Sequence, residues 1–380
     1  MQPQDDYLCS CLSVCSQFVP PLATHIIHPT KTIAPEQLDE FLARGWRPTG
    51  QSIYTSDYLR TDDDELHGCL QIRLPLRGFQ FKKRHRKLLR RNGARFRVTR
   101  ETARFPDGEL LRVNRLYMAL HPEKSREDLE YNVMNEDGER VLNTQLLRVY
   151  EGDRLVGFSY FDVGRQVMYT KAGIYDPAYA QYSLGVYTML LEVAHARERG
   201  FTYYYPGYYA PTYPAFDYKL VLGQMEYRDI ASGRWLTHPA SGEPGPLDPL
   251  TQNRDMLLEI RQLLLRSGFT ADFREYPSFT GRFRPSRDGE NQMLDAPLLL
   301  LLGRSLPLDL YFVITFDNES QTYRYDIVRT ANLYDMRVQL ISRSGVPRFT
   351  TPVVVHDRLL ETAEPAKIVQ LLRRRLRARM

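Results

Sequence analysis

The stretch from Gln145 to Tyr205 constrains the fold of this 380-residue chain more than any other. Two alternating patterns, QLLRVY and RLVGFSYFDV, flank Glu151-Gly152-Asp153 and predict a β-hairpin. VMYTKAGIYDP predicts a third strand, and FTYYY a fourth after an intervening helix that ends near Arg199. On that helix, which follows Ser183, one face carries Leu184, Tyr187, Leu191 and Ala194. The sequence therefore predicts an antiparallel meander, then a helix, then a further strand.

This order of elements resembles the acetyltransferase-like (GNAT) core, which implies an α/β (α+β) fold class. In that architecture a turn from strand to helix binds an acyl donor or its phosphate. The physical basis is the set of exposed N–H donors and the positive end of the helix dipole.

We expect three segments in the chain. Residues 1–100 form a Cys-bearing N-terminal region that includes the basic contact region, and residues 101–240 form the GNAT-like core. The Pro- and Gly-rich SGEPGPLDPL at 241–250 reads as a linker. Residues 250–380 form an added α+β segment of unknown role.

Periodic stretches outside the core predict further elements. The predicted helices are APEQLDEFLARGW, KKRHRKLLRRNG, EKSREDLEYNVMNE, RDMLLEIRQLLLRSG and AKIVQLLRRRLRARM. SIYTSDYLR and ARFRVTRET predict strands, and DLYFVITFDNESQTYRYDIVRTA predicts a hairpin.

Positive charge is concentrated between Leu66 and Arg100, where there are twelve Lys or Arg and no Asp or Glu. Such a block indicates a polyanion partner, and a solvated charged face is the alternative. Its centre is the predicted helix at Lys82–Arg91, with Leu88 and Leu89 as the expected buried stripe. The candidate nucleic-acid contacts are Lys82, Lys83, Arg84, Arg86, Lys87, Arg90 and Arg91. The arginines between Arg373 and Arg379 would be a second contact or a solvated terminal helix.

The N-terminus MQPQDDYLCS is acidic and has no apolar core of a signal peptide, and no apolar run reaches the ~18 residues of a membrane span. We therefore expect a cytoplasmic protein that does not bind a membrane. Its four cysteines are expected to be thiols or ligands rather than disulfides.

Three stretches together resemble the aminoacyl-tRNA–protein transferase family, which comprises the arginyl-tRNA–protein transferases and the bacterial aspartate/glutamate leucyltransferases. They are RGWRPTGQSIY at 44–54, GCLQIRLPLRGFQFKKRHRKLLRRN at 68–92, and the long stretch from Ile174 to Lys219. Within them the matching residues include Arg73, Phe79, Asp176, Ser183, Gly185, Tyr187, Gly207, Tyr208, Tyr209, Tyr218 and Lys219. Pro48, Gly68, Ala215 and Phe216 depart from the family pattern, so the chain resembles a divergent member.

The resemblance implies transfer of an amino acid, with arginine expected, from aminoacyl-tRNA to the N-terminal α-amine of proteins that begin with Asp or Glu. No cofactor is required, because the ester is already activated and the main task is positioning, worth ~7–11 kcal/mol at best. The oligomeric state is left open. The expected catalytic residues are Asp176, Tyr208, Tyr218 and Lys219.

The resemblance also suggests individual roles. Asp176 would bind an amine, and Lys219 an acidic side chain or the tRNA end. Ser183 and Gly185 would present N–H groups to the donor, with a plain Ser N-cap as the alternative. Tyr208, Tyr209 and Tyr218 would stack on the terminal adenosine, whereas packing is the alternative for Tyr203–Tyr205. The substrate- and tRNA-binding set is completed by Arg73, Tyr187 and Gly207.

The cysteines are Cys9, Cys11, Cys15 and Cys69. In some family members cysteines near this position hold an iron–sulfur cluster, and four thiolates can ligate such a cluster or Zn²⁺. Ordinary free thiols are the alternative.

Two other functions stay open on the sequence. One is a catalytically silent relative that binds tRNA or N-terminal peptides, which the Ala215-Phe216 departure favours. The other is a CoA-dependent N-acyltransferase, although QYSLGVY lacks the glycine spacing of a CoA-binding loop.

Overall fold

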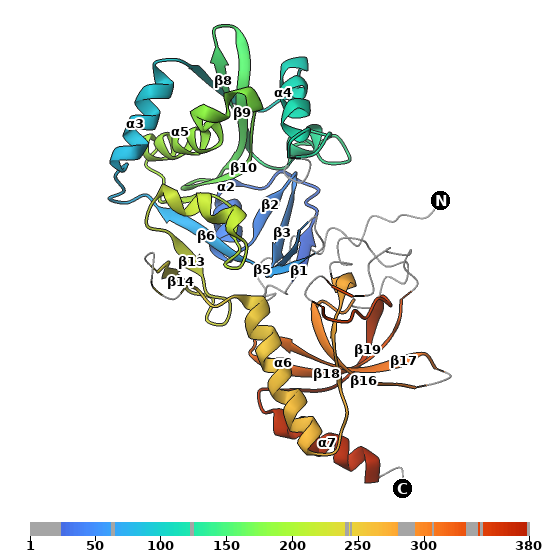
Figure 1. Cartoon of the computed structure of the whole chain (residues 1–380). Coiled ribbons are helices and arrows are strands. Elements are labelled where there is room, and N and C mark those ends of the chain that lie inside the picture. Colours follow the sequence, from blue (N-terminus) through green and yellow to red (C-terminus); the bar gives the residue numbers. More distant parts are fainter. Residues whose placement is uncertain are drawn as a thin grey trace, which may run out of the picture. The chain divides into compact units, whose positions relative to one another are not determined.

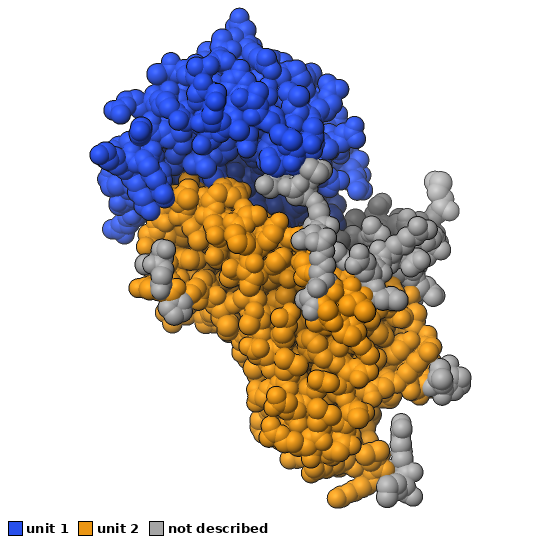
Figure 2. All heavy atoms as spheres, in the orientation of Figure 1, with its two compact units in different colours: residues 1–22, 27–54, 73–207 blue, residues 23–26, 55–72, 208–380 orange. Residues whose placement is uncertain are grey.

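The structure, a computed structural model, describes residues 24–61, 65–121, 125–239, 243, 245–279, 293–305, 308–331, 341–342 and 345–377. It is a mixed α/β protein (Figure 1). The chain divides into two compact units, shown in two colours in Figure 2. Unit 1 comprises residues 1–22, 27–54 and 73–207, and unit 2 comprises 23–26, 55–72 and 208–380. The division into the three segments expected from the sequence stays a prediction.

The predicted meander is confirmed and forms the centre of unit 1. Antiparallel neighbours follow one another as β7 (Arg97–Thr102), β8 (Thr144–Glu151), β9 (Arg154–Val163) and β10 (Val167–Tyr175). The β8–β9 turn uses Gly152 at φ +57°, a conformation that glycine adopts without strain. β11 (Tyr203–Tyr205) then lies parallel to β10, with Val167 opposite Tyr203 and Tyr169 opposite Tyr205.

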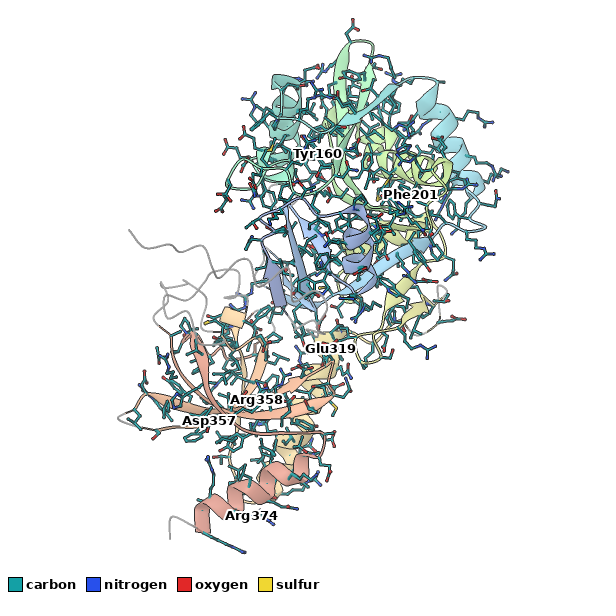
Figure 3. The ribbon with its side chains drawn as sticks, turned by 180° about the vertical axis from the view of Figure 1, so that it is seen from behind. Tyr160, Phe201, Glu319, Asp357, Arg358 and Arg374 are labelled. Atoms are coloured by element: carbon teal, nitrogen blue, oxygen red, sulfur yellow. The ribbon has the colours of Figure 1, made fainter. Side chains whose placement is uncertain are left out.

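The predicted helix between β10 and β11 is α5 (Leu184–Glu198). Its buried side chains recur at helical spacing along the face that packs on β10. Gly200, at φ +70°, follows the end of the helix, and Phe201 leads into β11 (Figure 3). A parallel β10–α5–β11 connection therefore closes the meander.

One helix expected from the sequence is wrong, and one was missed. The described part of EKSREDLEYNVMNE contains only the short η3 (Glu130–Asn132). The Asn135 side chain accepts hydrogen bonds from the backbone of Asp137 and Glu139, which competes with helix formation. The missed helix is α4 (Gly108–Met118), whose first turn is capped by the Asp107 carboxylate. α4 buries Leu110, Val113 and Tyr117 against the meander.

The remaining elements of unit 1 frame this core. They are α2 (Pro35–Ala43), β2 (Arg47–Thr49), β3 (Ser52–Ser56), α3 (Lys83–Gly93) and η4 (Pro177–Tyr182). β6 (Leu70–Pro75) runs from unit 2 into unit 1, and its Leu74–Pro75 end pairs with β11. β1 (Thr24–Ile27) joins the small sheet of β2 and β3.

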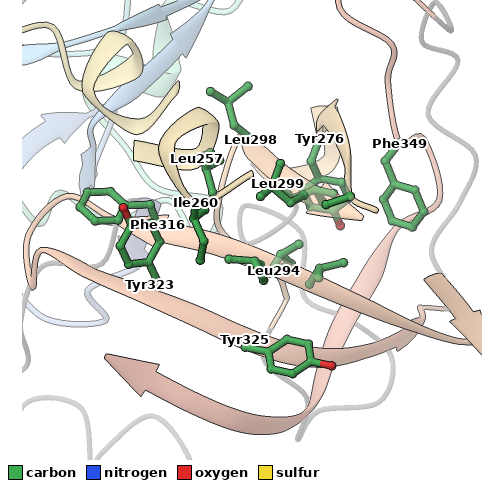
Figure 4. Close-up of a cluster of buried hydrophobic side chains, with 14 of the residues drawn as sticks. Leu257, Ile260, Tyr276, Leu294, Leu298, Leu299, Phe316, Tyr323, Tyr325 and Phe349 are labelled. Atoms are coloured by element: carbon green, nitrogen blue, oxygen red, sulfur yellow. The ribbon is translucent and has the colours of Figure 1, made fainter. Parts of the chain in front are cut away.

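Unit 2 contains a second antiparallel meander of its own. Its strands lie in the order β15 (Asp272–Glu275), β16 (Leu298–Ser305), β17 (Leu310–Asp317), β18 (Thr322–Thr330) and β19 (Val353–Thr362). The predicted hairpin is β17–β18, and the two predicted helices are α6 (Pro249–Arg266) and α7 (Pro365–Arg377). Leu257 and Ile260 of α6 lie beside Phe316 and Tyr323 of the sheet (Figure 4). Shorter elements of this unit are β4 (Tyr58–Arg60), β5 (Leu66–Gly68), β12 (Tyr208–Tyr209), η5 (Pro214–Leu222), β13 (Glu226–Arg228) and β14 (Trp235–Thr237).

Truncating α6 at its buried face should destabilise unit 2. Leu257 has no exposed surface, so Leu257→Ala should cost about 2–5 kcal/mol from lost burial and the cavity left behind. Leu265→Ala on the same helix, at a side chain 48% exposed, should cost less than about 0.5 kcal/mol. Urea unfolding followed by Trp235 fluorescence in a Trp46→Phe background measures both losses. Equal losses of the free energy of unfolding in the two variants would contradict the assignment of Leu257 to the core of unit 2.

Candidate functional site

The basic helix predicted at Lys82–Arg91 is α3, and Lys82 is its N-cap. Its buried face is formed by His85 and Asn92, with Leu88 and Leu89 half-buried between them. Asn92 anchors the helix, because its side-chain amide donates to the backbone oxygen of Tyr182 at 2.8 Å. The expected leucine stripe is therefore confirmed in part and is shared with two polar residues.

All seven Lys and Arg side chains from Lys82 to Arg91 are exposed. Within the described residues, no carboxylate lies within ion-pair distance of Lys82, Lys83, Lys87 or Arg90. Lys82 and Lys83 lie at the N-terminal end of α3, where cations oppose the helix dipole, so these two charges do not stabilise the helix. We call the exposed cations of Lys82–Arg91 the α3 patch.

Aromatic rings lie next to the α3 patch. Phe79 and Phe81 are 5.2 Å apart edge to face, and the Arg197 guanidinium lies 5.8 and 5.5 Å from their centroids. Cations interleaved with half-buried aromatic rings are the combination that single-stranded nucleic acids bind. Arg73 is different, because it is buried and lies 3.7 Å from the centre of the Tyr203 ring. Its predicted role in substrate binding stays a prediction.

The beginning of α5 carries the predicted donor-binding residues. Ser183 is exposed, adopts the left-handed conformation at φ +51°, and makes no side-chain cap hydrogen bond. The alternative of an ordinary Ser N-cap is therefore wrong, and the first N–H groups of α5 receive no such cap. A Cβ on Gly185 would lie 3.6 Å from the Tyr175 ring, so an alanine fits there. Tyr187 is buried and packs against Phe96.

The sequence analysis missed Glu192, on the buried face of α5. This carboxyl has no exposed surface and accepts a hydrogen bond from the Tyr204 hydroxyl at 2.8 Å. Burial raises the pKa of Glu192 to about 7. Its spacing offered the signal, because positions 184, 188, 192 and 196 form one helical face and the other three residues are buried there. The predicted packing of Tyr204 and Tyr205 is confirmed, since both are buried.

Asp176 lies between β10 and η4 and is buried. Its carboxylate accepts a hydrogen bond from the Ala178 amide at 3.1 Å and pairs with Arg154 at 2.8 Å and Arg112 at 3.9 Å. These contacts hold the turn before α5. Its role as an amine-binding residue stays a prediction.

The loop that follows Gly207 belongs to unit 2 and is organised around Lys219. The Lys219 ammonium donates to the backbone oxygen of Tyr208 at 2.6 Å. It also lies 4.7, 4.6 and 5.9 Å from the ring centres of Tyr208, Phe216 and Tyr218. Each such contact is worth roughly 0.5–2 kcal/mol, depending on desolvation. Phe216, one of the departures from the family pattern, therefore forms part of the enclosure of Lys219.

The other predicted residues of this loop differ in exposure. Gly207 has φ +90°, which favours glycine. Tyr209 is buried and pairs in β12 with Leu70 of β6. Tyr218 is 45% exposed, so its ring is the one most available for stacking. The catalytic roles predicted for Tyr208, Tyr218 and Lys219 are not tested by this geometry.

Comparison with known proteins gives the family. The family model described as "Arginine-tRNA-protein transferase, C terminus" matches residues 112–229. An aspartate/glutamate leucyltransferase of Leptospira interrogans is 24% identical over 218 residues, which cover 54% of this chain and 79% of that protein. One of Alkalilimnicola ehrlichii is 28% identical over 224 residues, covering 56% and 87%. These matches support the aminoacyl-tRNA–protein transferase family for this chain, as a divergent member.

Solved structures give weaker likenesses to this transferase. FemX aligns with a TM-score of 0.30 and 13% identity over 54% of this chain and 68% of its own. The C-terminal domain of a putative lysylphosphatidylglycerol synthetase from Agrobacterium fabrum aligns with a TM-score of 0.31 and 14% identity over 47% and 53%. The family match ends at residue 229, so α6, α7 and the second meander lie beyond it.

The cysteine prediction lies mostly outside the described residues, since Cys9, Cys11 and Cys15 are not among them. Cys69 is buried, and its thiol donates to the Ser56 backbone oxygen at 3.1 Å. Gly68 stands where the resemblance leads us to expect the first cysteine of a pair. A Cβ there would lie 2.6 Å from Pro249 Cδ and 2.9 Å from the Leu250 nitrogen, so a cysteine does not fit without movement. In the part of the chain that is described, no cluster of three or more His, Cys, Asp or Glu is arranged for a metal ion.

Among the helices described, none has the length and apolar character needed to cross a membrane.

Glu192 should make the stability of unit 1 depend on pH. Its pKa is about 7 in the folded state against an ordinary 4.5, so the folded state binds the proton more tightly. Its contribution to the free energy of unfolding should therefore fall as pH rises from about 4.5 to about 7. Urea unfolding followed by Trp46 fluorescence in a Trp235→Phe background should show this fall, and Glu192→Gln should remove it. Glu198→Gln, at a side chain 67% exposed on the same helix, should leave it in place. The same pH dependence with and without Glu192 would contradict the assignment.

Proposed function

We propose that this transferase moves an amino acid from aminoacyl-tRNA to the N-terminal α-amine of proteins that begin with Asp or Glu. The observation that carries the proposal is the family match over residues 112–229. The names of the curated relatives, aspartate/glutamate leucyltransferases, support the acceptor class. The α3 patch supports a nucleic-acid substrate, because its exposed Lys and Arg side chains can neutralise the phosphates of an RNA backbone.

The reaction forms an amide from an ester. The neutral α-amine attacks the ester carbonyl, the new N–C bond forms, and the C–O bond to the tRNA 3′ hydroxyl breaks. The amine loses one proton and the leaving hydroxyl gains one. The reference pKa of an α-amine is ~8, so weak basic assistance is enough. The main contribution of the protein to lowering the activation barrier is thus to position the two substrates.

We further propose that the core of unit 1 is GNAT-like and binds the aminoacyl end beside the start of α5. Its element order supports this, since a meander is followed by α5 and by a strand parallel to β10. The β10–β11 pairing ends at Tyr169 and Tyr205, while β10 continues to Tyr175. The N–H groups near exposed Ser183 offer hydrogen bonds to a carbonyl or to the developing oxyanion.

The amino acid transferred is the finer part of the proposal. The names of the matched relatives favour leucine, whereas the sequence analysis favoured arginine, which stays a prediction. Charged tRNA is made in the cytoplasm, so we propose that location as well.

The silent-binder alternative has one specific observation in its favour. The Lys219 ammonium is enclosed by Tyr208, Phe216 and Tyr218, and Phe216 is not the family's residue at that position. An amine held in this way is less available to a substrate.

A transfer assay separates these functions. Purified protein is incubated with tRNA charged with labelled leucine or arginine and with peptides that begin with Asp, Glu or Ala. Label should enter the Asp and Glu peptides, with a free but not an acetylated N-terminus, and not the Ala peptide. Bound tRNA without any label would establish the silent binder instead. Label that depends on acetyl-CoA would overturn both tRNA functions.

Neutralising the α3 patch should weaken tRNA binding. Each lost phosphate contact reduces the slope of log K against log salt by ~0.7–0.9, so K82Q/K87Q/R90Q should reduce it by roughly 2 to 3 and the affinity by roughly tenfold or more. The matched control is R44Q/R100Q/R165Q, which removes three cations that pair with Glu40, Glu198 and Glu36. Filter binding at several salt concentrations measures both quantities. Equal losses in the two triple variants would mean that only net charge matters.

A further inference from the structure

The helix α7 carries a stripe of exposed arginines. Within Pro365–Arg377 there are five Lys or Arg and no Asp or Glu. Arg373, Arg374 and Arg377 are exposed, and Figure 3 labels Arg374 on this helix. Lys367 and Gln370 precede them at helical spacing on the same exposed face. At ~1.5 Å per residue the stripe is ~15 Å long, enough to face several phosphates of one strand.

The pairing of these arginines differs from that of other arginines in unit 2. Arg304 pairs with Asp309, Arg324 with Asp317, and Arg358 with Asp326. Arg373, Arg374 and Arg377 have no carboxylate within ion-pair distance among the residues that the structure describes. Cations in the last turn of a helix do favour its dipole, but that gain is typically 0.3–1 kcal/mol and saturates with one or two charges. Stabilisation of the helix therefore does not account for all of this positive charge.

The opposite face of α7 excludes one class of partner. Basic amphipathic helices bind membrane surfaces by burying their apolar face in the lipid. In α7 that face is already used, because Ile368 and Val369 are buried in the core of unit 2 with Ile260 and Leu264 of α6. The face of α7 that is exposed to solvent is therefore its charged face. The helix itself is held in place by its apolar face, which is buried in the core of unit 2.

We propose that the exposed arginine stripe of α7 is a second RNA-binding surface, which contacts phosphates of the tRNA substrate. Arginine suits this contact because its planar fork binds phosphate oxygens through two N–H donors. The inference rests on the proposed function for the identity of the RNA. It gives the segment beyond the family match a role, namely affinity for the body of the tRNA.

The test compares the variant R373Q/R374Q/R377Q with wild type in full-length protein. Binding to an uncharged tRNA transcript is measured between 50 and 300 mM salt, and the salt slope should fall by roughly 2 to 3. R373K/R374K/R377K keeps the charge and should retain most of the slope. An unchanged far-UV circular dichroism spectrum of the glutamine variant excludes misfolding as the cause. The matched control R274Q/R304Q/R358Q removes three cations of unit 2 that lie outside α7 and pair with Asp272, Asp309 and Asp326, and should change the slope little.

Two outcomes would overturn the proposal. One is an unchanged slope, or the same loss in the control. The other is wild-type binding to vesicles that contain anionic lipid, lost in the glutamine variant while tRNA binding stays intact. The transfer assay keeps this inference separate from the proposed function. Labelled peptides with an unchanged slope would reject the α7 surface alone, and a reduced slope without any labelling would reject the transfer activity alone.

Discussion

The buried ion pair between Asp162 and Lys171 is the interaction on which unit 1 depends. Their charged atoms are 3.0 Å apart, and neither side chain is more than 3% exposed. Lys171 also donates to the Asn132 backbone oxygen and to the Thr144 hydroxyl, which in turn donates to Asp162 at 2.6 Å. Gln51, in the β2–β3 turn, donates to the same two oxygens. Removal of one member of such a pair leaves an uncompensated buried charge, at a cost of about 3–5 kcal/mol.

This network sets the geometry of the candidate site. Lys171 lies at the irregularity in β10, between Thr170 and Ala172, where the pairing register with β9 shifts. A bulge bends its strand and increases the local twist. The bend falls directly after Tyr169, where the pairing of β10 with β11 ends. The buried pair thus fixes the strand beside which the N-terminus of α5 presents its N–H groups.

Ion pairing, rather than charge alone, distinguishes the two basic surfaces. Arg148 holds Glu101 and Asp107, and Arg154 holds Asp176, so these cations serve the fold of unit 1. Lys82, Lys83, Lys87 and Arg90 of α3 and Arg373, Arg374 and Arg377 of α7 instead face solvent, with no carboxylate within ion-pair distance among the residues described. They lie in different units, and each is anchored by a buried face of its own helix.

Departures from the family pattern have steric explanations in unit 2. Gly68 replaces a cysteine where the backbone of Leu250 and the ring of Pro249 approach closely, at the beginning of α6. Phe216 packs on Tyr208 and Tyr213 and encloses Lys219.

The sequence by itself determined the local elements of this protein. Alternation and helical spacing predicted the meander, α3, α5, α6 and α7, because those patterns depend only on which side chains face a core. It also located the α3 patch, since charge is visible in composition. Only the tertiary structure decided how the segments combine. Residues 55–72 belong with 208–380, and the enclosure of Lys219 and the partners of Asp176, Lys171 and Glu192 come from distant contacts. Such pairings depend on which groups meet after burial, and local periodicity carries no information about that.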